Sequence, residues 1–195
     1  MTDTYRTIKG KSEGFYSEKR SKFFAFAHHV ENTDQIKEII AFYRKKYYDA
    51  RHVCYAYMLG AERTNFRAND DGEPSSTAGK PILGQINSKE LTNILIVVVR
   101  YYGGVNLGTG GLIVAYRSAA ADAIVNAEID ECPIEEIIIY QYPYSQTNQV
   151  LRIANELQAR IVSQTFDNDC TITLAVRQSQ VEQLNGRLKS LNLNK

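Results

Sequence analysis

The feature that most constrains this sequence is a run of apolar residues followed closely by a glycine-rich turn. Residues Ile94–Val99 are apolar at every position, which is typical of a strand buried on both faces of a sheet. Five glycines then fall within residues 103–111. Because glycine lets the backbone turn tightly and approach other groups closely, we predict a functional or packing turn there. Apolar residues at helical spacing then predict a helix over residues 110–127.

Length and composition set the class of protein. The chain has 195 residues, of which 44% are hydrophobic and 23% charged, as in ordinary globular proteins. Three cysteines without a CxxC pair indicate neither a disulfide framework nor a zinc site. The N-terminus lacks the apolar core of a signal peptide, and no apolar run would span a bilayer. We expect a soluble cytoplasmic protein of one large or two small domains, with no membrane association and no cofactor.

The charge is unevenly distributed, although the whole chain carries a formal net charge of only +1. Residues 1–67 carry a net charge of +5, residues 68–133 carry −4, and residues 134–195 are neutral. The basic first third is compatible with a patch that binds a polyanion such as RNA. It is equally compatible with the solvated end of a charged helix, because Arg44, Lys45, Lys46 and Arg51 follow a helical pattern.

The pattern of elements changes at Cys132 and Pro133. Before this point, the patterns predict extended residues over 12–30, a helix over 33–48, strands over 52–59, 65–68 and 91–100, and a short helix over 82–86. After it, strands over 134–142, 160–166 and 170–177 alternate with helices over 145–159 and 178–191, and a hairpin turn covers residues 167–169. We therefore expect an α+β chain with domains 1–133 and 134–195. The second has the β-α-β-β-α order of a split βαβ unit that lacks its last strand, since residues 192–195 are too few to supply one.

The glycine turn offers candidate anion-binding groups. Free N–H groups at the start of a helix attract phosphate, and Lys80 and Arg100 would add positive charge. Tyr101 and Tyr102 beside Arg100 could stack on nucleic-acid bases or simply pack at the strand end. The Walker A pattern is absent, so close packing of the turn remains the alternative. The candidate residues in the turn itself are Gly104, Gly108, Thr109, Gly110 and Gly111.

A second unusual loop, residues 69–81, carries three carboxylates, Asp70, Asp71 and Glu73. Such carboxylates can hold Mg²⁺ through water or act as general acid and base. They can also accept hydrogen bonds from the backbone of Ser75–Ala78 and order the loop. His52 and Cys54 share one face of their strand, which permits a catalytic pair, although half-buried packing is the commoner role. No metal site is assigned.

Two long motifs resemble the IMPACT family, and within it the bacterial YigZ-like members. They are DDGEPSSTAGKP at residues 70–81 and VVRYYGGVNLGTGGL at residues 98–112. The resemblance covers about residues 15–125 and leaves the remainder as a small ferredoxin-like domain. Ser76 stands where the family is expected to have glycine.

The resemblance implies a fold and a setting more than a reaction. The first domain would share the left-handed β-α-β fold of a small-subunit ribosomal protein and of the fourth domain of the ribosomal translocase. Eukaryotic relatives regulate translation by competing for a ribosome-associated activator of a kinase. We therefore hypothesise an RNA- or ribosome-binding protein that acts in translation or stress control. The alternatives are a metal-assisted enzyme on a phosphorylated small molecule and a protein-interaction module; the hypothesis leans away from an enzyme without excluding one.

Overall fold

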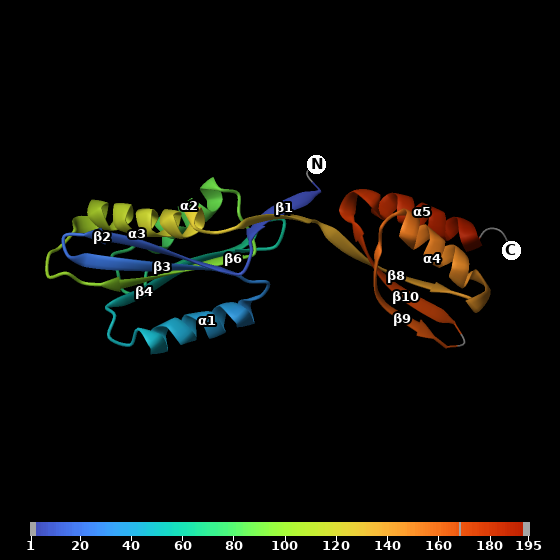
Figure 1. Cartoon of the computed structure of the whole chain (residues 1–195), viewed down its shortest axis with the longest axis horizontal. Helices are drawn as coiled ribbons and strands as arrows, with labels where there is room; N and C mark the ends of the chain where they lie inside the picture. The colour runs from blue at the N-terminus through green and yellow to red at the C-terminus, as the bar shows by residue number, and fades with distance from the viewer. Residues whose placement is uncertain (1–2, 168, 193–195) are drawn as a thin grey trace. The chain divides into compact units, whose positions relative to one another are not determined.

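The computed structural model describes residues 3–167 and 169–192, and Figure 1 shows their helices and strands. These residues form two compact units. The first unit spans Tyr5–Cys132, and the second contains Asp3, Thr4 and the described residues from Pro133 onward. Asp3 joins the second unit because its carboxylate accepts hydrogen bonds from the N–H and the hydroxyl of Ser179. The fold is therefore mixed α/β, with three separate sheets.

A five-stranded antiparallel sheet forms the centre of the first unit. Its strand order is β2 (Lys11–Glu18), β3 (Ser21–His29), β6 (Ile94–Tyr101), β4 (His52–Leu59) and β5 (Asn65–Asn69). Strand β6 lies in the middle, and each of residues 94–99 is fully buried. This confirms the prediction of a strand covered on both faces, and it follows from the absence of any polar side chain in that run.

Helices cover both faces of this sheet (Figure 1). Helix α1 (Thr33–Lys46) packs on one face, while α2 (Gly79–Ser88) and α3 (Gly108–Val125) pack on the other. Strand β4 shows why both faces are buried. Val53, Tyr55 and Leu59 belong to the core beside α1, whereas Cys54, Ala56 and Met58 belong to the core beside α2 and α3. The side chain of Asn32 caps the start of α1, where it accepts from the N–H of Asp34 and of Gln35.

Some elements differ from the sequence-based expectation. Helix α2 begins earlier than expected, because side-chain contacts of the preceding loop hold its first N–H groups. A two-stranded sheet of β1 (Thr4–Ile8) and β7 (Ile129–Pro133) was not predicted at all. These short strands carry polar residues and lie far apart in the sequence, so no local pattern predicts their pairing.

The second unit contains a three-stranded antiparallel sheet and two helices. The strand order is β8 (Glu135–Tyr142), β10 (Cys170–Arg177) and β9 (Arg160–Phe166). Helices α4 (Thr147–Glu156) and α5 (Val181–Asn192) each follow a single 3₁₀ turn, and Val150, Leu174 and Leu184 lie in the core between helices and sheet. The expected hairpin turn includes Asn168, which lies outside the described residues. The expected absence of a last strand concerns residues 192–195, of which Asn192 ends α5 and residues 193–195 lie outside the described residues.

The three cysteines form no disulfide among the described residues. Cys54 and Cys170 are buried, and Cys132 is partly exposed. Among the described helices, none is both long enough and apolar enough to cross a membrane.

One half-buried histidine, His28, makes the stability of the first unit dependent on pH. The imidazole Nε2 of His28 lies 2.8 Å from the Tyr43 hydroxyl. Burial, with a smaller effect of nearby Lys11, lowers the pKa of His28 to about 4 from its ordinary 6.5. Between pH 6.5 and 4 the unfolded chain therefore takes up the proton in preference to the folded one, and stability falls as the pH falls. Between pH 7 and 4.5, we expect the free energy of unfolding to fall by about 1 kcal/mol more in native protein than in His28→Gln. Urea unfolding measures this difference. Equal losses would contradict this role.

Candidate functional site

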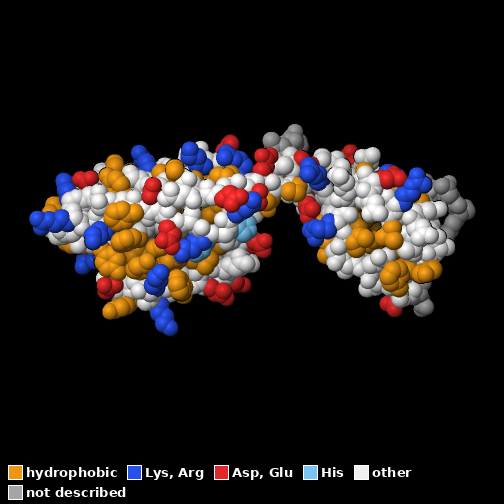
Figure 2. All heavy atoms as spheres, in the orientation of Figure 1, with side chains coloured by type: hydrophobic (Ala, Val, Ile, Leu, Met, Phe, Trp, Pro, Cys, Tyr) orange, Lys and Arg blue, Asp and Glu red, His pale blue; other side chains and the backbone are white. Residues whose placement is uncertain are grey.

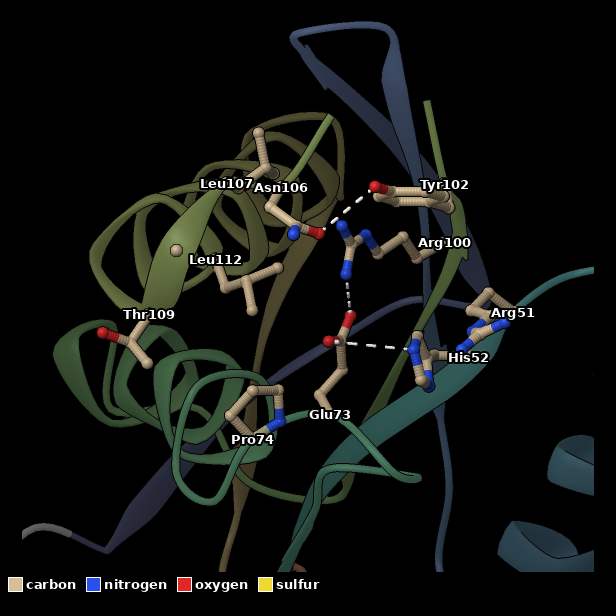
Figure 3. Close-up of a pocket in the computed structure, with 11 residues that line it drawn as sticks. Arg51, His52, Glu73, Pro74, Arg100, Tyr102, Asn106, Leu107, Thr109 and Leu112 are labelled. Carbon is tan, nitrogen blue, oxygen red and sulfur yellow. Dashed lines mark hydrogen bonds and ion pairs between the residues drawn. The ribbon is translucent and has the colours of Figure 1, made fainter. Parts of the chain in front are cut away.

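A pocket of about 520 Å³ lies on the α2 and α3 side of the first unit, where β6 ends and α3 begins (Figure 3). It unites the two unusual loops of the sequence, because Glu73 and Pro74 come from the first and Tyr102 to Thr109 from the second. Its remaining wall is the start of β4, which runs antiparallel beside the end of β6. The residues that line the pocket are Arg51, His52, Glu73, Pro74, Arg100, Tyr102, Asn106, Leu107, Gly108, Thr109 and Leu112.

A buried ion pair forms the floor of this pocket. Nη1 of Arg100 donates to Oε1 of Glu73 at 2.5 Å, and the Tyr116 hydroxyl donates to the same oxygen at 2.8 Å. Arg100 is 5% exposed and Glu73 is 8% exposed. The Nε atom of Arg100 is buried without a hydrogen-bond partner. An arginine has five N–H donors, so this guanidinium retains capacity for a further acceptor in the pocket.

His52 lies beside this pair with a fixed orientation. Its Nδ1 lies 2.8 Å from the carbonyl oxygen of Asp71. Because a carbonyl only accepts hydrogen bonds, Nδ1 must carry a proton. Nε2 lies 3.7 Å from Oε2 of Glu73, as the dashed line in Figure 3 shows. The imidazole therefore presents Nε2 to the pocket next to the ion pair.

Cys54 does not form a catalytic pair with His52. The Cys54 thiol is buried, and its Sγ lies 3.0 Å from the carbonyl oxygen of Asp70, to which it can donate, and 3.3 Å from the Tyr116 hydroxyl. Burial raises the pKa of Cys54, and also that of Tyr116. Both groups therefore stay protonated at neutral pH, and the thiol is not available as a nucleophile. The Tyr116 hydroxyl donates to Glu73, and Cys54 lies next to Tyr116.

The acidic loop is ordered by two of its own carboxylates. Asp70 accepts from the backbone N–H groups of Ser76, Ala78 and Gly79 at 2.8 to 3.0 Å. Asp71 accepts from the N–H of Val53 at 2.7 Å and pairs with Arg44 at 2.5 Å. These contacts correspond to the loop-ordering alternative, and they engage the oxygens that a metal ion would need. Across the described residues, no cluster of three or more acidic, histidine or cysteine side chains could hold a metal.

Removing the Asp70 carboxylate should therefore destabilise the first unit. In Asp70→Ala three N–H groups around the start of α2 lose their acceptor, and Ser76 loses a contact that holds its positive φ of 65°. We expect a loss of about 2 kcal/mol in the free energy of unfolding, measured with urea. Asp70→Asn keeps one acceptor oxygen and should lose less. Unchanged stability in both variants would show that the contacts do not order the loop.

The structure divides the glycines of the turn between different roles. Gly108, with φ of 72°, and Thr109 line the pocket as the first residues of α3. Gly103 packs against the β2–β3 turn, where an added Cβ would lie 2.2 Å from the carbonyl carbon of Arg20. Gly110 and Gly111 line a separate shallow hollow. Gly104 has open space around it.

The structure also places the other predicted site residues on different surfaces. Tyr102 lines the pocket, with its ring 5.6 Å from the Arg100 guanidinium. Tyr101 points to the opposite face of the sheet, since side chains alternate along a strand, and its hydroxyl donates to Asp49 at 2.7 Å. Lys80 is exposed on α2 and does not line the pocket. The second cation of the pocket is Arg51 instead.

Sequence reasoning missed Arg51 and Asn106 as site residues. Arg51 stood in the basic segment that the sequence singled out, but its place depends on pairing between the strands. The N–H of Arg51 donates to the carbonyl of Arg100 at 3.1 Å, which brings the two arginines to the same sheet end. Asn106 accepts from the Tyr102 hydroxyl at 3.2 Å. Only the fold of the glycine turn creates this contact.

The electrostatics of the pocket favour an anion. Two arginines and the first turn of α3 contribute positive charge, against the single carboxylate of Glu73. The N–H groups of Gly108 and Thr109 lie in that first turn, where no carbonyl of the helix can accept from them. Arg51 is exposed and forms no ion pair within the described part of the chain.

Comparison with known proteins gives consistent matches. A model of the Impact N-terminal domain matches residues 19–124. An IMPACT family member of Haemophilus influenzae is 32% identical over 87% of this chain and 84% of its own length. IMPACT family member YigZ of Escherichia coli is 31% identical over the same shares. The crystal structure of a protein described as hypothetical aligns with a TM-score of 0.77 and 26% identity, and covers 98% of this chain and 94% of that one.

Proposed function

The chain belongs to the IMPACT family, and we propose that it binds RNA by accepting a backbone phosphate in the pocket formed by Arg51, Arg100 and the start of α3. The observation that carries this proposal is the buried Arg100 guanidinium, whose Nε has no partner although Glu73 already occupies Nη1. The setting that we propose is translation or stress control in the cytoplasm, with RNA or the ribosome as partner.

A phosphate suits this pocket for electrostatic reasons. Glu73 holds Arg100 in place and compensates its charge while the pocket is empty. An entering phosphate would be attracted by Arg51, by the unpartnered donors of Arg100, and by the N–H groups of Gly108 and Thr109. Because these groups come from three separate elements, the pocket favours an anion with oxygens in several directions.

RNA suits it better than an isolated phosphate ion. A volume of about 520 Å³ is far larger than one ion requires and lies in the range of ligand pockets. Tyr102 stands at the rim with 48% of its surface exposed and offers an aromatic face next to the phosphate-binding groups. This combination of cation and exposed ring is typical of contacts with single-stranded nucleic acid.

We also propose the left-handed β-α-β fold for the first unit and the ferredoxin-like fold for the second, consistent with the order of their elements.

An enzyme acting on a phosphorylated small molecule is a second candidate, and one observation favours it. His52 lines the pocket, and its Nδ1 donates to the carbonyl of Asp71. In the neutral ring Nε2 is then the nitrogen without a proton, so Nε2 is the atom that could act as a base. Hydrolysis of phosphate esters by native protein, lost in His52→Gln, would favour this candidate over simple binding.

The proposal is tested by the affinity for single-stranded RNA. Arg51→Ala removes an exposed cation of the pocket, and we expect it to weaken binding roughly three- to tenfold at low salt. Arg67→Ala is the matched control, because Arg67 is an exposed arginine of the same sheet that pairs with Tyr57 on the α1 face. Fluorescence anisotropy with labelled RNA measures both. Equal affinity of native protein and Arg51→Ala would contradict the pocket, and no RNA binding by native protein would move a protein-interaction role to first place.

A further inference from the structure

We infer that a cluster of aromatic side chains on the α1 face of the first unit stacks on unpaired bases of the same RNA. This aromatic platform consists of Phe15, Phe24, Tyr47 and Tyr101. The inference rests on the proposed function and extends it, because it assigns a separate surface and a separate part of the ligand. The pocket binds phosphate, whereas the platform binds bases.

Strand register brings these rings together. Phe15 of β2 is paired with Phe24 of β3, and their ring centroids lie 5.1 Å apart. Tyr101 of β6 is paired with Lys22, two residues from Phe24, and the Phe24 and Tyr101 centroids lie 6.2 Å apart. Tyr47, just past the end of α1, lies nearly parallel to Phe24 at 6.5 Å. Four rings from four elements thus form one continuous surface.

The platform is open because α1 covers only part of the sheet. The helix packs on β6 and β4, whereas β2 is an edge strand on the far side of β3. Phe15 is 48% exposed, and an open hollow is lined by Phe15, Phe24, Phe26 and Tyr47. Figure 2 shows hydrophobic side chains gathered on this side of the first unit, with both basic and acidic side chains around them. An open surface with an exposed ring suits a stacked base better than an enclosed ligand.

Two lysines beside the platform are placed to meet the phosphates of a nucleic-acid strand. Lys22 lies on the same face as Phe24, and Lys46 lies 5.2 Å from the centroid of Tyr47. Neither lysine has a carboxylate partner in the described part of the chain, so both are free to meet phosphates. Three carboxylates also lie nearby, and Glu13 and Asp122 line the same hollow. Glu13 pairs with Lys11, whereas Asp49 and Asp122 accept from the neutral Tyr101 hydroxyl and the N–H of Phe15 and keep their negative charge.

The platform and the phosphate pocket lie on opposite faces of the sheet and meet at the same end of β6. Tyr101 and Tyr102 are consecutive residues at the end of β6, so they point to opposite faces of the sheet, one to the platform and one to the pocket. Arg51 lies beside this strand end. An RNA strand that leaves the pocket past Arg51 therefore reaches Tyr101 first and Phe24 and Phe15 next. A protein segment would need no such succession of cations and exposed rings.

Base stacking is tested with a short single-stranded RNA that contains one 2-aminopurine, whose fluorescence falls when it stacks. We expect native protein to quench it, and Phe15→Ala to lose the quenching and roughly 5- to 100-fold of the affinity. Phe15→Leu keeps an apolar side chain and should behave like the alanine variant. Phe66→Ala is the matched control, since Phe66 is 56% exposed on the edge strand β5 and pairs with Met58 on the opposite face.

An oligomer of the same length without bases separates the two proposals. It should bind native protein and Phe15→Ala with equal, weaker affinity, and Arg51→Ala should weaken it further. If Phe15→Ala binds ordinary RNA as tightly as native protein while Arg51→Ala does not, the platform is wrong and the pocket stands. If Phe15→Ala weakens RNA binding and Arg51→Ala does not, the pocket is wrong. Native protein that binds no RNA overturns both.

Discussion

Replacing Glu73 with alanine is expected to lower the free energy of unfolding by about 3 to 5 kcal/mol, the usual cost of leaving a buried charge unpaired. Arg100 is 5% exposed, and Glu73 is the only carboxylate within the described residues that pairs with it. The same change removes the acceptor for the Tyr116 hydroxyl, which is fully buried. Urea unfolding followed by circular dichroism measures the loss.

A double variant separates the unpaired charge from lost packing. In Glu73→Leu with Arg100→Met, no charge remains in the buried site, so we expect much of the stability to return. The double variant should bind RNA weakly, because the phosphate would lose its buried arginine. If Glu73→Ala is as stable as native protein, the pair is not the structural floor of the pocket.

Gly103→Ala is expected to cost about 3 kcal/mol or more, because the new methyl group would collide with backbone rather than with a mobile side chain. Its Cβ would lie 2.2 Å from the carbonyl carbon of Arg20 and 2.3 Å from the N atom of Ser21. The N–H of Gly103 also donates to the Ser21 hydroxyl at 3.1 Å. The turn after β6 would have to move away from the β2–β3 turn and would take the pocket wall with it.

Gly110→Ala is the control in the same turn. Gly110 lies in the first turn of α3, and a Cβ added there would have nothing within 4 Å of it. Because alanine favours helix, this variant should be as stable as native protein or more stable, by up to about 1 kcal/mol. Thermal unfolding of the two variants side by side gives the comparison. Similar stabilities would show that the glycines are present for another reason than close packing.

The sequence predicts most of the fold of the first unit because its signals are local. An uninterrupted apolar run identifies β6, the alternation that places His52 and Cys54 on one face identifies β4, and apolar residues at helical spacing identify α3. The sheet of β1 and β7 escapes prediction because its pairing joins segments more than a hundred residues apart. The boundary of α2 shifts because the carboxylate of Asp70, outside the helix, accepts from its first N–H groups.

The site is predictable only in part, for a similar reason. The two loops that line the pocket stand out in the sequence by composition, and Arg100, Tyr102, Gly108 and Thr109 all belong to it. Lys80 and Arg51 illustrate the limit. Lys80 lies within the conspicuous loop motif but on the exposed side of α2, whereas Arg51 reaches the pocket through strand pairing with β6. Which cation faces the pocket depends on the register of strand pairing, and composition does not determine that register.

The central claim, that the pocket receives an RNA phosphate, is tested most directly by nuclear magnetic resonance titration of isotope-labelled protein with single-stranded RNA. We expect the largest changes in amide chemical shift at Gly108 and Thr109, since their N–H groups would donate to the phosphate. The changes should saturate with the binding curve, and Arg51→Ala should shift that curve to higher RNA concentration. Shift changes that leave Gly108 and Thr109 unaffected while RNA binds elsewhere on the chain would contradict the account.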